Sequence, residues 1–98
     1  MHIRVDPEEA EITALRQVAN WRGAEVLEIG CGDGRLTRRL ARLGARVSAI
    51  DPNRGLIKEA RRTLPKSYLE QVKYSVGSAG TLKFRSRSFD IVVFAWSL

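Results

Sequence analysis

Glycine occupies every second position of one short segment, which lies between an apolar stretch and a helical pattern. Residues 26–29 (VLEI) are apolar except for Glu28, and they run directly into residues 30–34 (GCGDG). Glycines permit positive φ and a close approach of a ligand to the backbone, and the start of the following helix presents unpaired N–H groups. The segment therefore predicts a buried strand, a tight loop and a helix, with a nucleotide-type ligand at the loop.

Strand and helix patterns alternate along the rest of the chain. Asp6 as N-cap and Pro7 at the first helical position predict a helix to about residue 19, with apolar positions at Ile12, Leu15, Val18 and Ala19. We expect Trp21 to close the end of this helix over the core. A second helix carries Leu36, Leu40 and Leu43 on one face and ends at Gly44, and a third carries Leu56, Ile57 and Ala60 and stops near Pro65.

Four apolar stretches are expected to be strands, at residues 25–29, 45–50, 72–76 and 89–96. Residues 77–88 are expected to form a loop with a short helix or turn. Strands that alternate with helices of this length predict right-handed βαβ units. We therefore expect one α/β domain over residues 1–98, a Rossmann-like three-layer α/β/α arrangement with a parallel sheet in the order 3-2-1-4. Strand 25–29 is then central, and its carboxyl end lies at the switch point where such sheets bind ligands.

Composition limits the classes of partner. The net charge is +6, but the arginines are scattered along helices, which is typical of solvated helix faces and leaves nucleic acid as a secondary partner. No apolar run approaches the ~18 residues of a membrane span, and no signal or transit peptide is visible, so we expect a cytoplasmic protein. The single cysteine cannot form an internal disulfide, and one Cys with one distant His provides no metal site.

The glycine loop distinguishes two classes of ligand. A dinucleotide fingerprint, G-x-G-x-x-G, aligned on Gly30 and Gly32 would require a third glycine where Arg35 stands, so that match fails. The sequence instead has E-x-G-x-G-x-G over residues 28–34, then SAIDPN at 48–53 and FDIVV at 89–93. In these three motifs, in this order, the chain resembles the class I S-adenosylmethionine-dependent methyltransferases. The resemblance covers most of residues 25–97.

The resemblance implies a cofactor, S-adenosylmethionine, and a set of residues around it. An acid after the second strand binds the ribose hydroxyls, and the acid before the loop lies near the methionine amino group. The site residues implied are Glu28, Gly30, Cys31, Gly32, Gly34, Asp51, Pro52, Ser78, Ala79 and Ala95. Many members of the family have an acid at the position of Ser78, so its hydrogen bond to adenine would lack charge assistance here. The sequence indicates no general base, and the catalytic residues are not identified.

Several of these residues have a second interpretation. Asp51 is also a candidate N-cap of the third helix, and Asp33 of the second. Glu28 either accepts hydrogen bonds from loop N–H groups or faces a cationic group of the ligand, because a buried acid needs partners. The glycines alone would be explained by a tight turn. Cys31 is interpreted as a small buried residue of the loop rather than a nucleophile.

The expected function is transfer of a methyl group to a small-molecule acceptor. The alternative is a non-catalytic module that binds S-adenosylmethionine or a nucleotide and acts with a partner chain. Methyltransferases of this class have a seven-stranded sheet, whereas this sequence accounts for four strands, the amino-terminal half. The last strand, Ile91 to Trp96, is apolar on both faces although it would be an edge. We therefore expect either that the sequence is the amino-terminal half of a longer enzyme or that this strand pairs with a second copy or a partner chain.

Overall fold

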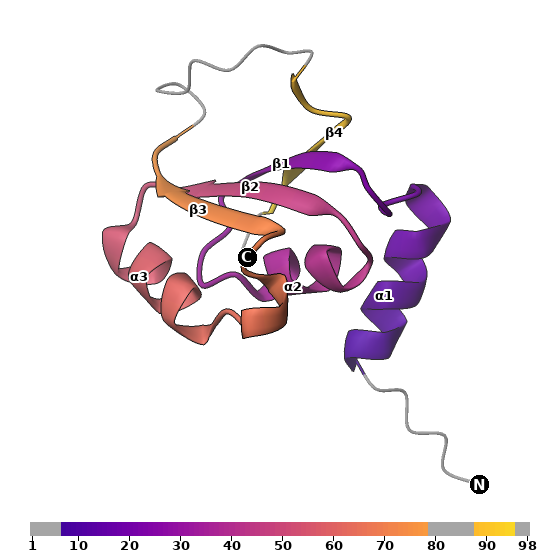
Figure 1. Ribbon diagram of the computed structural model, residues 1–98, viewed down its shortest axis with the longest axis horizontal. Helices are drawn as coiled ribbons and strands as arrows, with labels where there is room; N and C mark the ends of the chain where they lie inside the picture. The colour runs from indigo at the N-terminus through magenta and orange to yellow at the C-terminus, as the bar shows by residue number, and fades with distance from the viewer. Residues whose placement is uncertain (1–6, 79–87, 96–98) are drawn as a thin grey trace, which may run out of the picture.

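The computed structural model describes residues 7–78 and 88–95, and Figure 1 shows the arrangement of their helices and strands. The elements follow the predicted alternation, with ends that differ from the predicted ones by a few residues. In chain order they are α1 (Pro7–Val18), β1 (Glu25–Ile29), α2 (Arg35–Arg42), β2 (Arg46–Asp51), α3 (Arg54–Thr63), a 3-10 turn (Lys66–Tyr68), β3 (Val72–Val76) and β4 (Ile91–Phe94). The predicted N-cap Asp6 and the predicted strand residue Trp96 lie outside the described residues.

The four strands form one parallel sheet in the order β3-β2-β1-β4, as predicted. Val26 of β1 pairs with Val47 of β2 on one side and with Ile91 of β4 on the other. The carboxyl ends of β1 and β2 therefore end side by side in the middle of the sheet. This arrangement brings the loop after β1 next to Asp51, the last residue of β2.

The helices α2 and α3 cover the same face of the sheet (Figure 1). The connections from β1 to β2 and from β2 to β3 both move in one direction across the sheet. Right-handed crossovers in one direction place their helices on one face. The second helical layer predicted from the sequence is not formed by any element within residues 7–78 or 88–95. Most of the connection from β3 to β4 lies outside those ranges.

The core lies between this face and the helices. Apolar side chains from every strand and from α2 and α3 meet there, chiefly Val26, Ala49, Leu40, Ile57 and Ala60. Gly44 ends the α2 segment with a φ of 93° and donates its N–H to Ala41 O at 2.9 Å, which confirms the predicted helix stop. Among the described residues, no helix is long and apolar enough to cross a membrane.

Helix α1 contacts the core at only part of its predicted apolar face. Ile12 is fully buried, whereas Val18, which shares the same helical spacing, is 74% exposed. The indole of Trp21, rather than Val18, packs against the core at the end of α1. It is 4% exposed and donates Nε1–H to Leu15 O at 2.8 Å. The prediction that Trp21 closes this helix over the core is confirmed.

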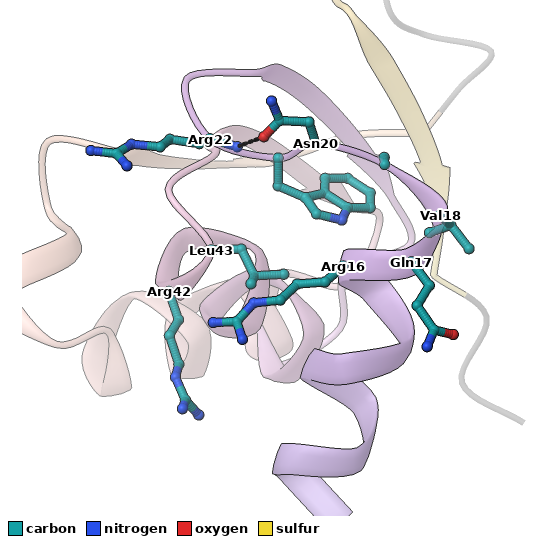
Figure 2. A pocket seen from close by; sticks show the side chains of 9 residues that line it. Arg16, Gln17, Val18, Asn20, Arg22, Arg42 and Leu43 are labelled. Atoms are coloured by element: carbon teal, nitrogen blue, oxygen red, sulfur yellow. Dashed lines mark hydrogen bonds between the residues drawn. The ribbon is translucent and has the colours of Figure 1, made fainter.

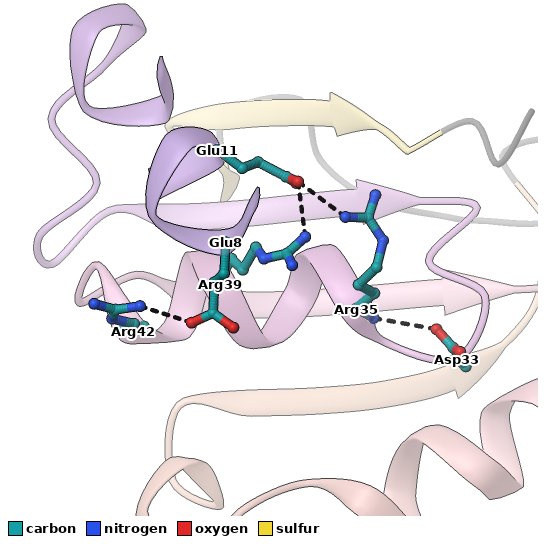
Figure 3. Close-up of polar contacts among 6 residues, drawn as sticks. All are labelled: Glu8, Glu11, Asp33, Arg35, Arg39 and Arg42. Carbon is teal, nitrogen blue, oxygen red and sulfur yellow. Dashed lines mark hydrogen bonds and ion pairs between the residues drawn. The ribbon is translucent and has the colours of Figure 1, made fainter. Parts of the chain in front are cut away.

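Ion pairs join α1 to α2 (Figure 3). Glu11 accepts from Arg35 at 2.9 Å and from Arg39 at 2.7 Å, and Arg42 contacts both Glu8 and Glu9 at 2.6 Å. Arg35 is the first residue of α2, directly after the glycine loop. The acidic half of α1 is thus attached along the whole length of α2.

Candidate functional site

The glycine loop is held at the carboxyl edge of the sheet by backbone hydrogen bonds. Gly30 N and Cys31 N both donate to Ile50 O, at 2.8 and 2.9 Å, so the start of the loop is attached to the neighbouring strand β2. Gly34 N donates to Cys31 O at 3.0 Å and closes the turn before α2. The loop is therefore a defined structure between β1 and α2 rather than a freely hinged connection.

The three glycines of the loop serve different purposes, although all have positive φ. A Cβ on Gly30 would lie 3.0 Å from Ala95 O, and a Cβ on Gly34 would overlap the hydroxyl of Tyr74. Side chains at these two positions are excluded by the protein itself. A Cβ on Gly32 would meet no atom within 4 Å. The space beside Gly32 is open, and it is the position of the loop where a ligand can approach the backbone.

Asp51 connects the end of β2 to this loop. Its Oδ2 accepts from Gly32 N at 3.0 Å, and its Oδ1 accepts from Asn53 N at 2.9 Å. The alternative role of Asp51 as N-cap of α3 is wrong, because Asn53 is the N-cap and accepts from Leu56 N at 3.0 Å. Each carboxylate oxygen of Asp51 uses one lone pair for a backbone N–H and keeps a second for another donor.

Glu28 is fully buried one residue before the end of β1. It pairs in register with Ala49, which in turn pairs with Tyr74, so all three face the helical layer. Glu28 Oε1 accepts from the hydroxyl of Thr37 on α2, and Oε2 has no partner among the described residues. Burial raises the pKa of Glu28 to about 7, against the opposing effects of the Thr37 hydrogen bond and the charge of Arg35. The observed partner is thus a helix hydroxyl and not the loop N–H groups.

Two further polar groups lie buried beneath the loop. Burial raises the pKa of the Cys31 thiol to about 12, and the charges of Glu28 and Asp51 act in the same direction. The thiol therefore stays neutral, as expected for a structural residue rather than a nucleophile. The Tyr74 hydroxyl is also buried and has no hydrogen-bond partner within the described ranges, and its burial raises its pKa to about 12.

The remaining predicted residues lie at the same edge. Pro52 is exposed directly after Asp51, and Ser78 is half-buried after β3, where Gly77 N donates to Asp51 O at 3.0 Å. Ala95 follows β4 and donates its N–H to Ile29 O at 2.9 Å. Ala79 lies outside the described residues. The fold brings together every predicted site residue that the structure describes.

Reasoning from the sequence missed two residues below the loop: Thr37, which donates to Glu28, and Tyr74, which lies beside Gly34. The sequence held a signal for Thr37, because it is a polar residue three positions before Leu40 on the apolar face of α2, and β1 carries the acid Glu28 that needs a partner. Nothing in the sequence pointed to Tyr74, because its contact with Gly34 joins residues 40 positions apart and depends on how β3 is placed. The alternative role of Asp33 as N-cap of α2 is wrong, because Gly34 is the N-cap; Asp33 instead accepts from Arg35 N at 3.3 Å just before the helix.

Comparison with known proteins gives a consistent result. The profile of a family described as "Methyltransferase domain" matches residues 26–98. A ubiquinone biosynthesis O-methyltransferase of Methylocella silvestris is 44% identical over 71 residues, which are 72% of this chain and 27% of that protein. The chain thus spans about a quarter of the length of the curated relative.

Two solved structures share the fold. The magnesium protoporphyrin IX methyltransferase of Synechocystis PCC 6803, solved with bound S-adenosylmethionine, has a TM-score of 0.73 at 25% identity and covers 89% of this chain and 41% of its own. A TehB-like S-adenosylmethionine-dependent methyltransferase of Corynebacterium glutamicum has a TM-score of 0.69 at 29% identity, covering 91% and 44%. Because the family profile matches most of the chain, from β1 onward, the chain belongs to the methyltransferase domain family.

Proposed function

We propose that this chain binds S-adenosylmethionine at the carboxyl edge of its sheet and forms the cofactor-binding part of a methyltransferase with a small-molecule acceptor. One observation carries the proposal: Asp51 Oδ2 accepts from Gly32 N at 3.0 Å. This contact places a carboxylate with free lone pairs beside the position of the loop where the space is open. A ligand with vicinal hydroxyl groups and a part that lies flat on the backbone suits such a site.

Each of these residues would contact a different part of the cofactor. Asp51 would accept the two ribose hydroxyls, one on each carboxylate oxygen, while both oxygens keep their backbone donors. Gly32 would let the methionine part lie against the loop, and Ser78 would accept from the adenine amino group. The roles of Glu28, Gly30, Cys31, Gly34, Pro52, Ala79 and Ala95 at the cofactor belong to the same proposal.

Bound S-adenosylmethionine supplies an activated methyl group, so the protein mainly aligns the acceptor and excludes water. Neither acid in the site is placed as a general base: Glu28 is buried below the loop, and both carboxylate oxygens of Asp51 accept from backbone N–H groups. The curated relative named above is an O-methyltransferase of ubiquinone biosynthesis. This name supports a small-molecule acceptor with a hydroxyl group.

A second candidate function is a non-catalytic cofactor-binding module that works with a partner chain. The observation in its favour is the β4 edge, where Val92 is 45% exposed and Phe94 is 56% exposed. In the described part of the chain, β4 pairs with β1 only. A strand added at this edge, from a second copy or from another chain, would pair with the outer side of β4 and shield part of both side chains.

Calorimetry of the folded chain with S-adenosylmethionine, S-adenosylhomocysteine and NAD tests the proposal. We expect binding of the first two but not of NAD, and a loss of at least tenfold in affinity for Asp51→Asn, whose amide group would face a backbone N–H. Asp33→Asn is the matched control, because it makes the same change in charge in the adjacent glycine loop and should keep the affinity within twofold. Failure of both S-adenosylmethionine and S-adenosylhomocysteine to bind at millimolar concentration would overturn the cofactor assignment.

Binding without methyl transfer to hydroxylated aromatic acceptors, in the presence of the folded chain alone, would favour the non-catalytic module. Transfer by the chain alone would favour the enzyme.

A further inference from the structure

A hollow of about 610 Å³ lies between the end of α1, the turn before β1 and the end of α2. Its lining comprises residues 16–22 together with Arg42 and Leu43, and we call it the arginine groove (Figure 2). Residues 20–22 precede β1 and Leu43 precedes β2, so the groove is at the amino edge of the sheet. The glycine loop and Asp51 are at the carboxyl edge, and none of their residues lines the groove.

The charge of the groove has one sign. Of the described residues that line it, three are arginines and none is acidic. Arg42 is already paired with Glu8 and Glu9, but Arg16 and Arg22 form no ion pair with any residue within the described ranges. Two cationic side chains are therefore available to an anionic ligand.

The groove also has a fixed apolar wall. The indole of Trp21 is held by its bond to Leu15 O, and Gly23 N donates to Gly44 O at 2.9 Å, which ties the turn to the end of α2. Figure 2 shows Leu43 between Arg22, which extends above it in the view, and Arg16 and Arg42, whose guanidinium groups lie below it. Asn20 Oδ1 accepts from Arg22 N at 3.3 Å, so the amide of Asn20 presents its N–H2 group as a further donor.

We propose that the arginine groove binds a phosphate-bearing ligand with an apolar or aromatic part. A guanidinium group donates two parallel hydrogen bonds to phosphate oxygens, and two unpaired arginines match the charge of a diphosphate or of a dianionic phosphomonoester. The apolar part would lie against Leu43 and the indole of Trp21. The site is separate from the proposed cofactor site, and either can fail without the other.

Titration of the chain with inorganic pyrophosphate at low ionic strength, followed by calorimetry and by the amide signals of residues 16–22, tests the proposal. We expect saturable binding that weakens at least tenfold in the double variant Arg16→Gln, Arg22→Gln. The control is Lys58→Gln, Lys66→Gln, which removes the same charge from exposed positions on α3 and the 3-10 turn and should keep the affinity within twofold. Equal losses in both variants, or no binding of pyrophosphate at 10 mM, would overturn the proposal.

Vesicles distinguish the two sources of phosphate. Sedimentation with phosphatidylglycerol vesicles but not with phosphatidylcholine vesicles, lost in the arginine variant and competed by pyrophosphate, assigns a lipid headgroup. Pyrophosphate binding without sedimentation assigns a free phosphate ligand. Sedimentation that the arginine variant retains would show that another surface binds the vesicles, and it would contradict the lipid assignment.

Discussion

The two edges of this sheet are constructed in different ways. At the carboxyl edge, the backbone makes the site: Gly30 and Cys31 are bonded to Ile50, Gly32 is bonded to Asp51, and polar groups are buried beneath the loop. At the amino edge, three arginines lie around the buried indole of Trp21; Arg42 is paired with Glu8 and Glu9, whereas Arg16 and Arg22 are exposed and form no ion pair with a described residue. The difference indicates that the carboxyl edge is preorganised, whereas the amino edge presents positive charge without a fixed arrangement of its charged groups.

This comparison has a consequence for substitutions. At the carboxyl edge a changed residue should alter the stability of the fold as well as ligand binding, because the same contacts support both. At the amino edge a changed arginine should leave the stability nearly constant, since exposed charges contribute little.

The largest expected effect is that of Gly34→Ala. The residue has a φ of 89°, and its Cβ would overlap the Tyr74 hydroxyl, so strain and overpacking together should cost about 3 kcal/mol of unfolding free energy. Gly23→Ala is the control: its φ is 73° but its Cβ would meet open space, so the cost should be about 1 kcal/mol. Urea unfolding measures both. Equal losses in the two variants would mean that the packing under the loop is loose.

The next effect concerns the titration of Glu28. Its pKa in the folded protein is about 7, above the value of 4.5 for an unperturbed glutamate, so the folded state holds the proton more tightly. The resulting stability is fully present below pH 4.5 and is lost as the pH rises through 7. Relative to Glu28→Gln, the wild type should lose up to about 3 kcal/mol between pH 4 and pH 8. Urea unfolding at several pH values measures this difference. If the unfolding free energies of the two proteins change in parallel with pH, the burial of the Glu28 carboxyl group is contradicted.

Thr37→Val should cost about 1 to 2 kcal/mol, because it removes the hydroxyl that donates to buried Glu28. The same change should raise the pKa of Glu28 further, which a carboxyl NMR titration would follow. Thr37→Ser keeps the hydroxyl and should leave that pKa near its wild-type value. A carboxyl pKa that is the same in the valine variant would show that Thr37 does not support the acid.

The smallest effect is expected for Glu11→Gln, which removes the ion pairs of α1 with Arg35 and Arg39. Partly exposed pairs of this kind contribute less than about 1 kcal/mol. The loss should be measurable in thermal unfolding at low ionic strength and should disappear in 1 M salt. A loss that salt does not change would point to packing of the Glu11 stem rather than to charge.

The sequence allowed the strand order and the place of the loop to be predicted, because both follow from local patterns and from the handedness of crossovers. It identified Asp51 but not the form of its contacts, since the bond to Gly32 N depends on the exact register of β2 with β1. The exposure of Val18 could not be predicted, because helical spacing alone does not show that Trp21 fills the end of α1. Tyr74 was missed because Gly34, the loop residue it lies against, is in a distant segment of the sequence.

The most direct test of the central claim is a titration of the isotopically labelled chain with S-adenosylmethionine, followed by backbone amide NMR. We predict that the changes in chemical shift will concentrate at residues 30–34, 51–53 and 77–78, with the amide of Gly32 among the largest, while residues 16–22 at the amino edge stay unchanged. Changes confined to the amino edge, or no change at millimolar ligand in the folded chain, would contradict a cofactor site at the carboxyl edge of the sheet.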